Sequence, residues 1–424
     1  MNSVKASLAA LLAVSGWSFG FQAQAQDGGN FARDRNVSVR GRPKPEYDAA
    51  GIAMGDFRLY PQLQVSAEYN DNIFATKSAA EGDTLVNVDA KLELLSQWAN
   101  HALNFRLESP STLYQSNDRN NTTDIQATVD GRLDIYRDFF VHGEADYGDL
   151  HEPLASNPTS FSLREPVHYN RDHANIGVVK AFNRVRVSGE ADFTRFDYED
   201  ARLLNNAPVE EDDRDREVLQ VGGRIDYALS PMTAFFFSAS ANTRDYKLDP
   251  PFATVNRDSD GVQALVGANF DVTHLVRGEV GVGYLRQSYD EPGVSDTSGL
   301  AVNAHVEWFP DELVTFNVDA SREVDDAGAV GAYSYVANNV TVGVDYEYRR
   351  NLVLGLSSDY SEDEYNGIDR TDDRWDVVAK ADYLVNRGVS LFVEGGHYVQ
   401  SSTGAQAGRE YEINRAVIGV RLRR

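Results

Sequence analysis

From about position 57 to its end, the chain alternates apolar and polar residues with a period of two. Val86, Val88 and Ala90 alternate with Asn87 and Asp89, and the same rhythm recurs in segment after segment. Successive side chains of a β-strand point to opposite faces, so this alternation predicts strands with one apolar and one polar face. A soluble sandwich buries the apolar face, whereas a membrane barrel turns that face toward lipid and its polar face toward a lumen.

Eighteen such segments are predicted, and the links between them alternate in length. The strands are expected at 57–69, 84–97, 102–114, 124–135, 139–148, 172–181, 185–196, 217–228, 233–245, 260–271, 276–287, 298–308, 313–322, 336–348, 352–360, 374–383, 388–399 and 411–422. Short turns are expected at 99–101, 136–138, 182–184, 229–232, 272–274, 309–312, 349–351 and 384–387. Long, polar, acidic links are expected at 70–83, 115–123, 149–171, 197–216, 246–259, 288–297, 323–335, 361–373 and 400–410. This order is typical of an all-β, up-and-down antiparallel transmembrane barrel with short periplasmic turns and long extracellular loops.

Aromatic residues near the strand ends support the same topology, because amphipathic rings prefer the two membrane–water interfaces. The belt expected near the short turns comprises Trp98, Tyr136, Phe139, Phe182, Phe235, Trp308, Phe309, Tyr348 and Tyr383. The belt expected near the long loops comprises Tyr69, Tyr114, Tyr147, Phe193, Tyr284, Tyr360 and Trp375. The ordinary enrichment of aromatic residues in β-strands is the alternative explanation. A soluble multi-sheet protein is the main structural alternative, and it would place its charged face outside and mix its loop lengths.

The first residues have the three parts of a secretory signal, which are the positive Lys5, an apolar stretch and an A-x-A cleavage site ending at Ala25. We therefore expect residues 1–25 to be removed, residues 26–56 to form a largely irregular periplasmic tail, and residues 57–424 to form the barrel. No other stretch is continuously apolar over eighteen residues. A membrane-spanning helix is therefore not expected.

The charge balance is strongly negative, with 40 Lys and Arg residues against 65 Asp and Glu residues and a formal net charge of −25. Nucleic-acid binding requires a basic surface, so this balance argues against that class of partner. The chain contains no cysteine. Thiol catalysis and disulfide bonds are therefore excluded, and the expected fold must be stable without them.

The polar face of nearly every predicted strand carries charged residues, and an Arg or Lys facing lipid at mid-depth would cost about 2–4 kcal/mol. The residues expected to line the lumen are Arg106, Glu108, Asp130, Arg132, Asp134, Glu144, Asp146, Arg186, Glu190, Asp192, Arg224, Asp226, Glu279, Glu307, Asp345, Glu347, Asp376, Lys380 and Asp382. One interpretation is a polar passage of negative bias that binds sugar hydroxyls or favours cations. The other is a wall in which basic and acidic side chains of neighbouring strands neutralise one another. The two interpretations are compatible.

Enzyme chemistry is not expected from this chain. Its eight histidines are scattered without metal-ligand spacing, and no G-x-S-x-G nucleophile motif occurs. Neither a metal ion nor a cofactor is therefore assigned. Oxygen-rich stretches at 210–213 and 258–261 lack the full calcium-loop pattern, so solvated loops are the favoured interpretation and Ca²⁺ binding by the acidic loops is left open.

Two short motifs at the start of the predicted barrel resemble a known family. EYNDNIF at 68–74 closes the first strand, and SQWANHAL at 96–103 spans the first short turn. Together they resemble the putative β-barrel porin 2 family of proteobacterial outer-membrane proteins, from about Phe57 to the C-terminus. The aromatic residue that usually ends such barrels is missing here, and Leu422 is the candidate for its role.

The resemblance implies a function that the periodicity alone does not. Some members of the family are encoded with exopolysaccharide machinery, so it implies an outer-membrane channel that translocates a secreted polysaccharide with a periplasmic export protein. It implies no catalytic residues. A general or substrate-selective diffusion porin for small polar solutes is the first alternative, and a structural or adhesive surface barrel is the second. A long loop folded inward, at 149–171 or 197–216, would favour the porin. Outer-membrane lipid is an expected partner in each case, and nothing in the sequence marks an oligomeric interface.

Overall fold

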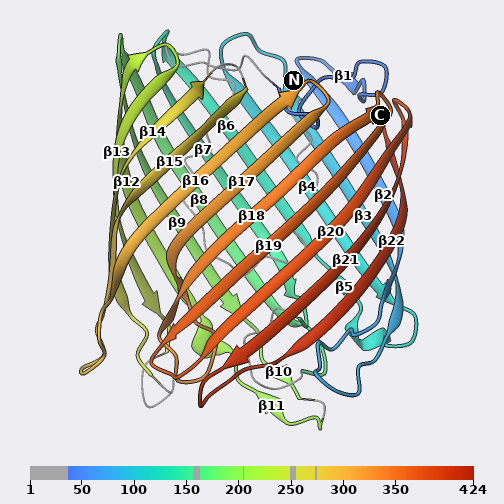
Figure 1. Cartoon of the computed structure of the whole chain (residues 1–424), viewed down its shortest axis with the longest axis vertical. Coiled ribbons are helices and arrows are strands. Elements are labelled where there is room, and N and C mark those ends of the chain that lie inside the picture. The colour runs from blue at the N-terminus through green and yellow to red at the C-terminus, as the bar shows by residue number, and fades with distance from the viewer. Residues whose placement is uncertain (1–36, 156–162, 204, 249–254, 273–274) are drawn as a thin grey trace.

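Long antiparallel strands wrap into a closed barrel (Figure 1). The computed structural model describes residues 37–155, 163–203, 205–248, 255–272 and 275–424. Within these residues eighteen long strands follow one another around the wall, which confirms the predicted all-β fold and strand number. Their bounds are β2 Phe57–Asn70, β3 Asp83–Ser96, β4 Ala102–Tyr114, β6 Ile125–Tyr136, β7 Phe139–Glu152, β8 Val167–Phe182, β9 Val185–Tyr198, β12 Arg216–Ser230, β13 Thr233–Tyr246, β14 Ser259–Val272, β15 Val276–Tyr289, β16 Thr297–Asp311, β17 Val314–Asp326, β18 Ser334–Arg349, β19 Leu352–Asn366, β20 Thr371–Asn386, β21 Val389–Thr403 and β22 Tyr411–Arg423.

Short elements accompany the wall. They are β1 (Ile52–Met54) beside β2, β5 (Thr122–Thr123) beside β4, the pair β10 (Ala201–Arg202) and β11 (Pro208–Val209), and the single 3₁₀ turns η1 (Asp118–Asn120) and η2 (Asp212–Arg214). In the described part of the chain, no helix has the length and apolar character needed to span a membrane.

The barrel closes where its first and last long strands meet. β2 pairs with β22 in antiparallel register from Gln62 opposite Arg423 to Asn70 opposite Arg415. Closure satisfies the backbone hydrogen bonds of every long strand on both sides, which is the condition for crossing lipid with strands. The C-terminus and the short turns lie at one end of the barrel, and the long loops lie at the other (Figure 1).

Most of the observed strands are longer than the predicted ones, chiefly toward the long loops. β8 begins at Val167 rather than 172, and β19 ends at Asn366 rather than 360. The link expected at 361–373 is consequently reduced to residues 367–370. Residues on both faces are polar in these extensions, as in the sequence SEDEYN at the end of β19. The alternation that locates a strand in the sequence therefore fades before the strand itself ends.

The apolar face of the wall points outward. Ile176, Val266 and Ile418 expose 60%, 56% and 63% of their surface, whereas the charged Arg224 and Asp226 expose 8% and 9%. This is the reverse of a soluble protein, in which charged groups are almost never buried and apolar groups are. The outward face therefore suits lipid, and the polar face lines the interior.

The predicted aromatic belts need correction at two positions. Phe309 is only 6% exposed, and the Arg277 guanidinium lies 5.3 Å from its ring centroid. Since Trp308 faces outward, the period of two turns its neighbour Phe309 inward. Tyr114 lies opposite the buried Leu85 in the β3–β4 register, so it also faces the interior. The position of an aromatic residue at a strand end does not by itself indicate which face it occupies.

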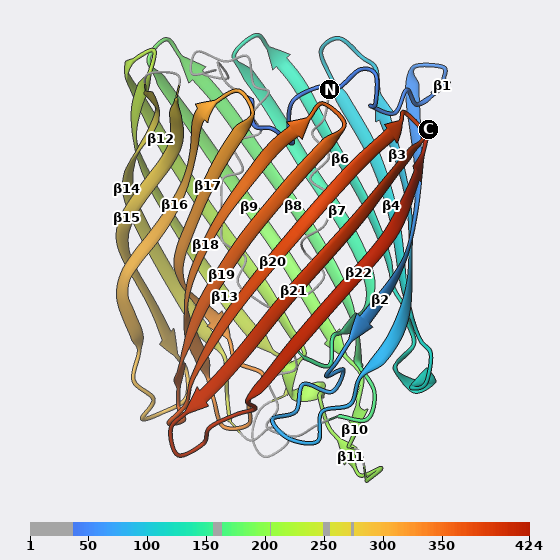
Figure 2. The same ribbon diagram turned by 45° about the vertical axis from the view of Figure 1, so that its right-hand side comes forward.

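The N-terminal part of the description begins at residue 37, so the predicted signal peptide at 1–25 lies outside the described residues. Residues 37–51 contain neither helix nor strand, and β1 follows them with three residue pairs to β2. In Figure 2 the blue segment before β1 lies at the end of the barrel where the short turns gather. This segment, residues 37–48, is called the N-terminal segment below.

Candidate functional site

The inner wall carries ion pairs between strands, and the clearest example centres on Arg224 of β12. Its guanidinium donates to Asp226 on the same strand at 2.8 Å and to Glu279 on β15 at 2.7 Å. The same guanidinium lies 4.0 Å from the ring centroid of Phe236. The group is thus bound on several sides, as a buried charge must be.

Other candidate lumen residues are also held by neighbours on the wall. Arg106 pairs with Glu93 and Glu108, Asn104 donates to Asp130, Arg132 to Asp134, Arg171 to Asp146, Asn175 to Glu190, and Arg277 to Glu307, while His173 contacts Asp192 and Lys380 lies 4.0 Å from Glu394. Glu144 lies 4.0 Å from His173, Arg186 lies opposite Asp226, and Asp376 lies opposite Tyr398. Asp345, Glu347 and Asp382 instead pair with the N-terminal segment. Charge pairing is therefore a property of this wall, and the role of these residues in conduction stays a prediction.

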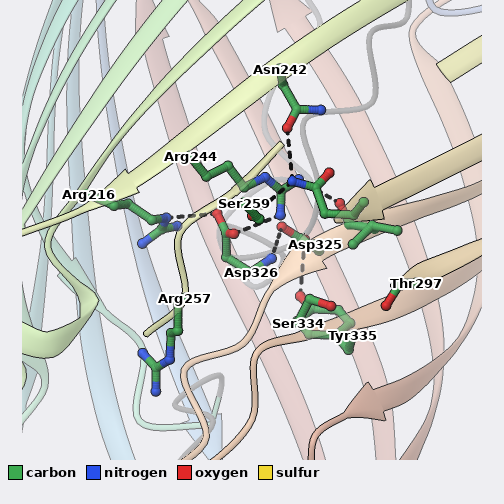
Figure 3. A network of polar contacts seen from close by, with 12 residues as sticks. Arg216, Asn242, Arg244, Arg257, Ser259, Thr297, Asp325, Asp326, Ser334 and Tyr335 are labelled. Atoms are coloured by element: carbon green, nitrogen blue, oxygen red, sulfur yellow. Dashed lines mark hydrogen bonds and ion pairs between the residues drawn. The ribbon is translucent and has the colours of Figure 1, made fainter. Parts of the chain in front are cut away.

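A second kind of contact crosses the interior. Asp326, at the end of β17, accepts hydrogen bonds from Arg216 of β12 at 2.8 Å and from Arg244 of β13 at 2.7 Å. Figure 3 shows the two arginines converging on this carboxylate. β13, β14, β15 and β16 separate β12 from β17 along the wall, so the Arg216–Asp326 pair spans the inside of the barrel. We call Arg216, Arg244 and Asp326 the charged clamp.

The clamp is supported by further polar contacts at the same level (Figure 3). Gln287 donates to Ser259 at 2.9 Å and to Asn242 at 3.2 Å. Arg257, in the link between β13 and β14, donates to the carbonyl of Ala332 at 3.1 Å. It also donates to the carbonyl of Asp213, which belongs to the link between β9 and β12. Links from three parts of the wall therefore meet beside the clamp.

The long loop after β7 folds onto the inner wall. Leu154 and Leu163 of this loop pack in one buried cluster with Tyr169 of β8 and Tyr198 of β9. Tyr169 and Tyr198 lie opposite each other, on the same face as the interior residue His173. Loop residues that bury against this face must lie inside the barrel. Phe74, from the link after β2, packs against the same cluster.

The loops also contact one another across the extracellular end. Arg409, between β21 and β22, donates to the carbonyls of Leu154 at 2.8 Å and Ala155 at 3.2 Å. β2, β3, β4 and β6 separate these two links along the wall. The loops therefore contact one another over the arc of the extracellular opening between β7 and β22.

A buried ionic cluster joins the link between β9 and β12 to Glu152 at the end of β7. Arg214 donates to Glu152 at 2.5 Å and to Glu211 at 2.9 Å, and its guanidinium lies 4.1 Å from the ring centroid of Tyr198. Burial raises the pKa of the Glu211 carboxyl, and the Arg214 charge opposes that rise. The adjacent carboxylates hold the pKa of Arg214 well above its ordinary value despite its burial. The cluster therefore keeps its cation at any working pH.

Mostly uncharged residues line one hollow of the wall. A shallow hollow is lined by Gly222 and Ser238, by Gln263 and Leu265 of β14, and by Glu190 on its rim. Small side chains and a primary amide leave room and hydrogen-bonding groups there.

The described residues contain no group of three or more His, Asp or Glu side chains arranged to hold a metal ion. The oxygen-rich stretches considered for Ca²⁺ have other partners. Glu211 binds Arg214, Asp258 accepts a hydrogen bond from the Tyr246 amide at 2.7 Å, and Ser259 accepts one from Gln287.

Sequence patterns could not find the charged clamp or the N-terminal contacts. Arg244 falls within the strand predicted at 233–245, but Arg216 falls in the link expected at 197–216. The alternation also gives no information on which strands face each other across the interior. Asp326 lies at a strand end where both faces are polar, and nothing in its neighbours marks an arginine partner 110 positions away.

The fold and the charged interior define an outer-membrane β-barrel channel. The family model described as putative beta-barrel porin 2 matches residues 44–424, and the chain belongs to this family. The family is a class of channels and not of enzymes, and it places the chain in the outer membrane. The predicted family and location are thus confirmed. A search of curated proteins found no match.

Solved outer-membrane structures share the barrel at low identity. OccAB4 of Acinetobacter baumannii is 9% identical with a TM-score of 0.46, over 90% of this chain and 100% of that one. A BenF-like porin of Pseudomonas fluorescens Pf-5 is 10% identical with a TM-score of 0.45, over 87% and 99%. OpdK of Pseudomonas aeruginosa is 11% identical with a TM-score of 0.43, over 86% and 99%. These similarities concern the fold alone and transfer no substrate to this chain.

Proposed function

We propose that this outer-membrane channel is a selective pore for small polar solutes. The observation that supports it best is the charged clamp of Arg216, Arg244 and Asp326, which spans the interior. The inward packing of the loop after β7 onto Tyr169 narrows the same half of the barrel. A narrowed passage with fixed charges selects solutes by size and charge.

The expected charge preference is for cations. Of the nineteen residues expected to line the lumen, fourteen are acidic and five are basic. Rings of carboxylates favour cation passage. Since many of these carboxylates are paired, the preference should be modest and should weaken as salt screens the unpaired excess.

Polysaccharide translocation with a periplasmic export protein, which the resemblance implied, is the rival proposal. A polymer requires a continuous passage as wide as a sugar chain, and the loop contacts of Arg409 with Leu154 and Ala155 lie across its exit. Export would therefore require these contacts to open. A structural or adhesive barrel is the remaining rival, and it predicts no solute flux.

Conductance and permeation distinguish these proposals. The purified barrel in planar bilayers under a KCl gradient should show small, modestly cation-selective conductance. Proteoliposomes should swell with small neutral sugars but not with long oligosaccharides. Passage of long oligosaccharides would contradict the selective pore. So would a deletion strain that loses exopolysaccharide while its small-solute permeability is unchanged, since that result favours export.

A further inference from the structure

The N-terminal segment, residues 37–48, is bound at the end of the barrel that carries the short turns. Val39 is fully buried, and its backbone amide donates to the Thr315 hydroxyl of β17 at 3.0 Å. Arg40 donates to Asp345 of β18 at 2.6 Å and to Asp382 of β20 at 2.9 Å. One arginine of the segment therefore joins two strands of the wall.

Further basic residues of the segment converge on a third carboxylate. Lys44 and Arg42 each lie 3.6 Å from Glu347 of β18. Glu347 is 4% exposed and Lys44 is 5% exposed. Asp345 and Glu347 are two positions apart on β18, so they share the inner face. We call Asp345, Glu347 and Asp382 the acidic mouth.

Basic residues of the periplasmic turns and the last strand hold the backbone of the segment. Arg350 donates to the carbonyl of Pro43 at 3.1 Å, Arg387 to that of Pro45 at 2.8 Å, and Arg423 to that of Tyr47 at 2.9 Å. The contacts thus run from β17 through β18 and β20 to β22. The segment therefore follows the rim of the periplasmic opening along the consecutive strands from β17 to β22.

We propose that the acidic mouth is a docking site for a short basic segment, and that residues 37–48 occupy it as a removable plug of the periplasmic opening. The chemistry of the site fits this occupant. Carboxylates on the inner face form ion pairs with Arg40 and Lys44. Arginines on the turns donate hydrogen bonds to the carbonyl groups of Pro43 and Pro45. The plug is independent of which solute the pore conducts.

Several features make the segment removable. Residues 37–51 add no strand to the barrel, so their release breaks no ladder. The Arg40 side chain is 37% exposed, and ion pairs exposed to this degree are individually weak and screened by salt. The buried pair of Lys44 with Glu347 is the contact that release must break. Gly51 and Gly55 have φ values of 68° and 63°, and they flank β1. These glycines permit the sharp changes in backbone direction that would let the segment swing away from β2.

Tethering keeps a released segment available for rebinding. The segment is joined to the barrel through β1, so its effective concentration at the acidic mouth is of the order of millimolar. A weak individual affinity is then sufficient for the plug to occupy the mouth most of the time. The same mouth would accept a basic segment of a second protein once the plug has left it.

The first test removes the charges of the plug. The variant Arg40→Ala/Lys44→Ala should raise the ratio of open to closed dwell times in planar bilayers roughly tenfold, because it removes the paired charges of the segment. The matched control is Arg137→Ala/Arg184→Ala, which removes the same charge from exposed short turns at the same end. The control should leave gating unchanged. Equal effects of both variants would overturn the proposal.

The second test locks the plug. The chain has no cysteine, so Val39→Cys/Thr315→Cys places a single pair at the 3.0 Å contact between the Val39 amide and the Thr315 hydroxyl. This contact brings the two Cα atoms within about 7 Å, a separation that a disulfide can bridge. Oxidation should hold the channel closed, and reduction should restore gating. Unchanged conductance on oxidation, with the disulfide verified by mass spectrometry, would overturn the proposal.

The third test uses the plug as a ligand. A peptide with the sequence of residues 37–48, added on the side of the short turns, should block the Arg40→Ala/Lys44→Ala channel. Addition on the side of the long loops should have no effect. Block from both sides or from neither would contradict docking at the acidic mouth. These tests measure open probability. A negative result would overturn the plug but would not affect the proposed selective pore, which is tested by ion selectivity.

Discussion

The Asp326 carboxylate pairs with two arginines. Its loss should therefore change the charge of the passage more than the loss of a lumen carboxylate with a single partner. Arg216 and Arg244 are held within 2.8 Å of the same carboxylate. An arginine left unpaired in a confined passage attracts anions and repels cations. The balance of the clamp thus depends on one acidic side chain.

The substitution Asp326→Asn should shift the pore toward anions. It removes the carboxylate that Arg216 and Arg244 share, so less of their positive charge is neutralised and the reversal potential in a KCl gradient should move in the anion-selective direction. Asp311→Asn is the matched control, since it removes the same charge at the exposed short-turn end of β16. A shift of the same size in the control would show that total charge, and not the clamp, sets selectivity.

Glu211 provides a pH dependence for the link between β9 and β12. Burial raises its pKa in the folded state above the value of a free glutamate, with Arg214 opposing. A carboxyl with a raised pKa contributes stability that is fully present below its ordinary pKa and is lost as pH rises through the raised pKa. Loop packing should therefore loosen as pH rises above the ordinary range of a glutamate. Hydrogen exchange of residues 199–215, corrected for the intrinsic rate, measures this.

Glu211→Gln is the control for that prediction. Glutamine has the shape of the protonated carboxyl but does not titrate. Exchange in the variant should lose most of its dependence on pH in this range. If the variant retains the full dependence, another group is responsible for it.

At the scale of the strand, the alternation of faces decides what each position tolerates. Val266 and Gln263 belong to the same strand, β14, but Val266 faces lipid and Gln263 lines the interior hollow. The substitution Val266→Arg should cost about 2–4 kcal/mol of unfolding free energy near the bilayer midplane. Gln263→Arg should cost much less, because its guanidinium can remain in water. Urea unfolding in lipid vesicles compares the two, and equal costs would mean that the faces have been assigned wrongly.

The strands were predictable from the sequence because their pattern is local. Each of the eighteen predicted segments overlaps a long strand of the described residues, and the closed antiparallel order follows from the alternation of short and long links. The ends were less predictable. β8 and β19 extend beyond their predicted limits because polar residues on both faces remove the periodic signal where the strand leaves the lipid.

The candidate site was predictable only in part, for a physical reason. Pairs within one strand, such as Arg224 and Asp226 of β12, follow from the polar face of that strand. The contacts of Arg216 with Asp326 and of Arg40 with Asp345 join positions 110 and 305 residues apart. Their geometry depends on the curvature and closure of the whole barrel, which no local pattern encodes. The inward direction of Phe309 was not predicted for a simpler reason. Its position at a strand end suggested the aromatic belt, although its neighbour Trp308 already occupies the outward face.

At the scale of the whole molecule, stability depends on the single seam where the ends of the sheet meet. Ala67 of β2 lies opposite Ile418 of β22 on one side and Val86 of β3 on the other. The substitution Ala67→Pro removes a ladder hydrogen bond beside the seam and should cost about 1–3 kcal/mol, the cost of a buried backbone group left without its partner. Ala67→Val, which keeps the amide and suits a strand, is the control. Heat-dependent mobility of the folded barrel on gels provides the measurement, and an unaffected proline variant would contradict the importance of the seam.

The binding of the N-terminal segment has a consequence for biogenesis. Its partners Thr315, Asp345 and Asp382 come from β17, β18 and β20, whereas the segment itself precedes β1. The segment emerges early from the inner membrane, yet its docking site exists only after the later strands have been inserted. The nascent barrel must therefore be assembled with an open periplasmic end and sealed last. Until then the basic N-terminal segment would be accessible to chaperones and insertion factors, and it would become inaccessible once the barrel is complete. Docking of the N-terminal segment would then distinguish a completely assembled barrel from an incomplete one.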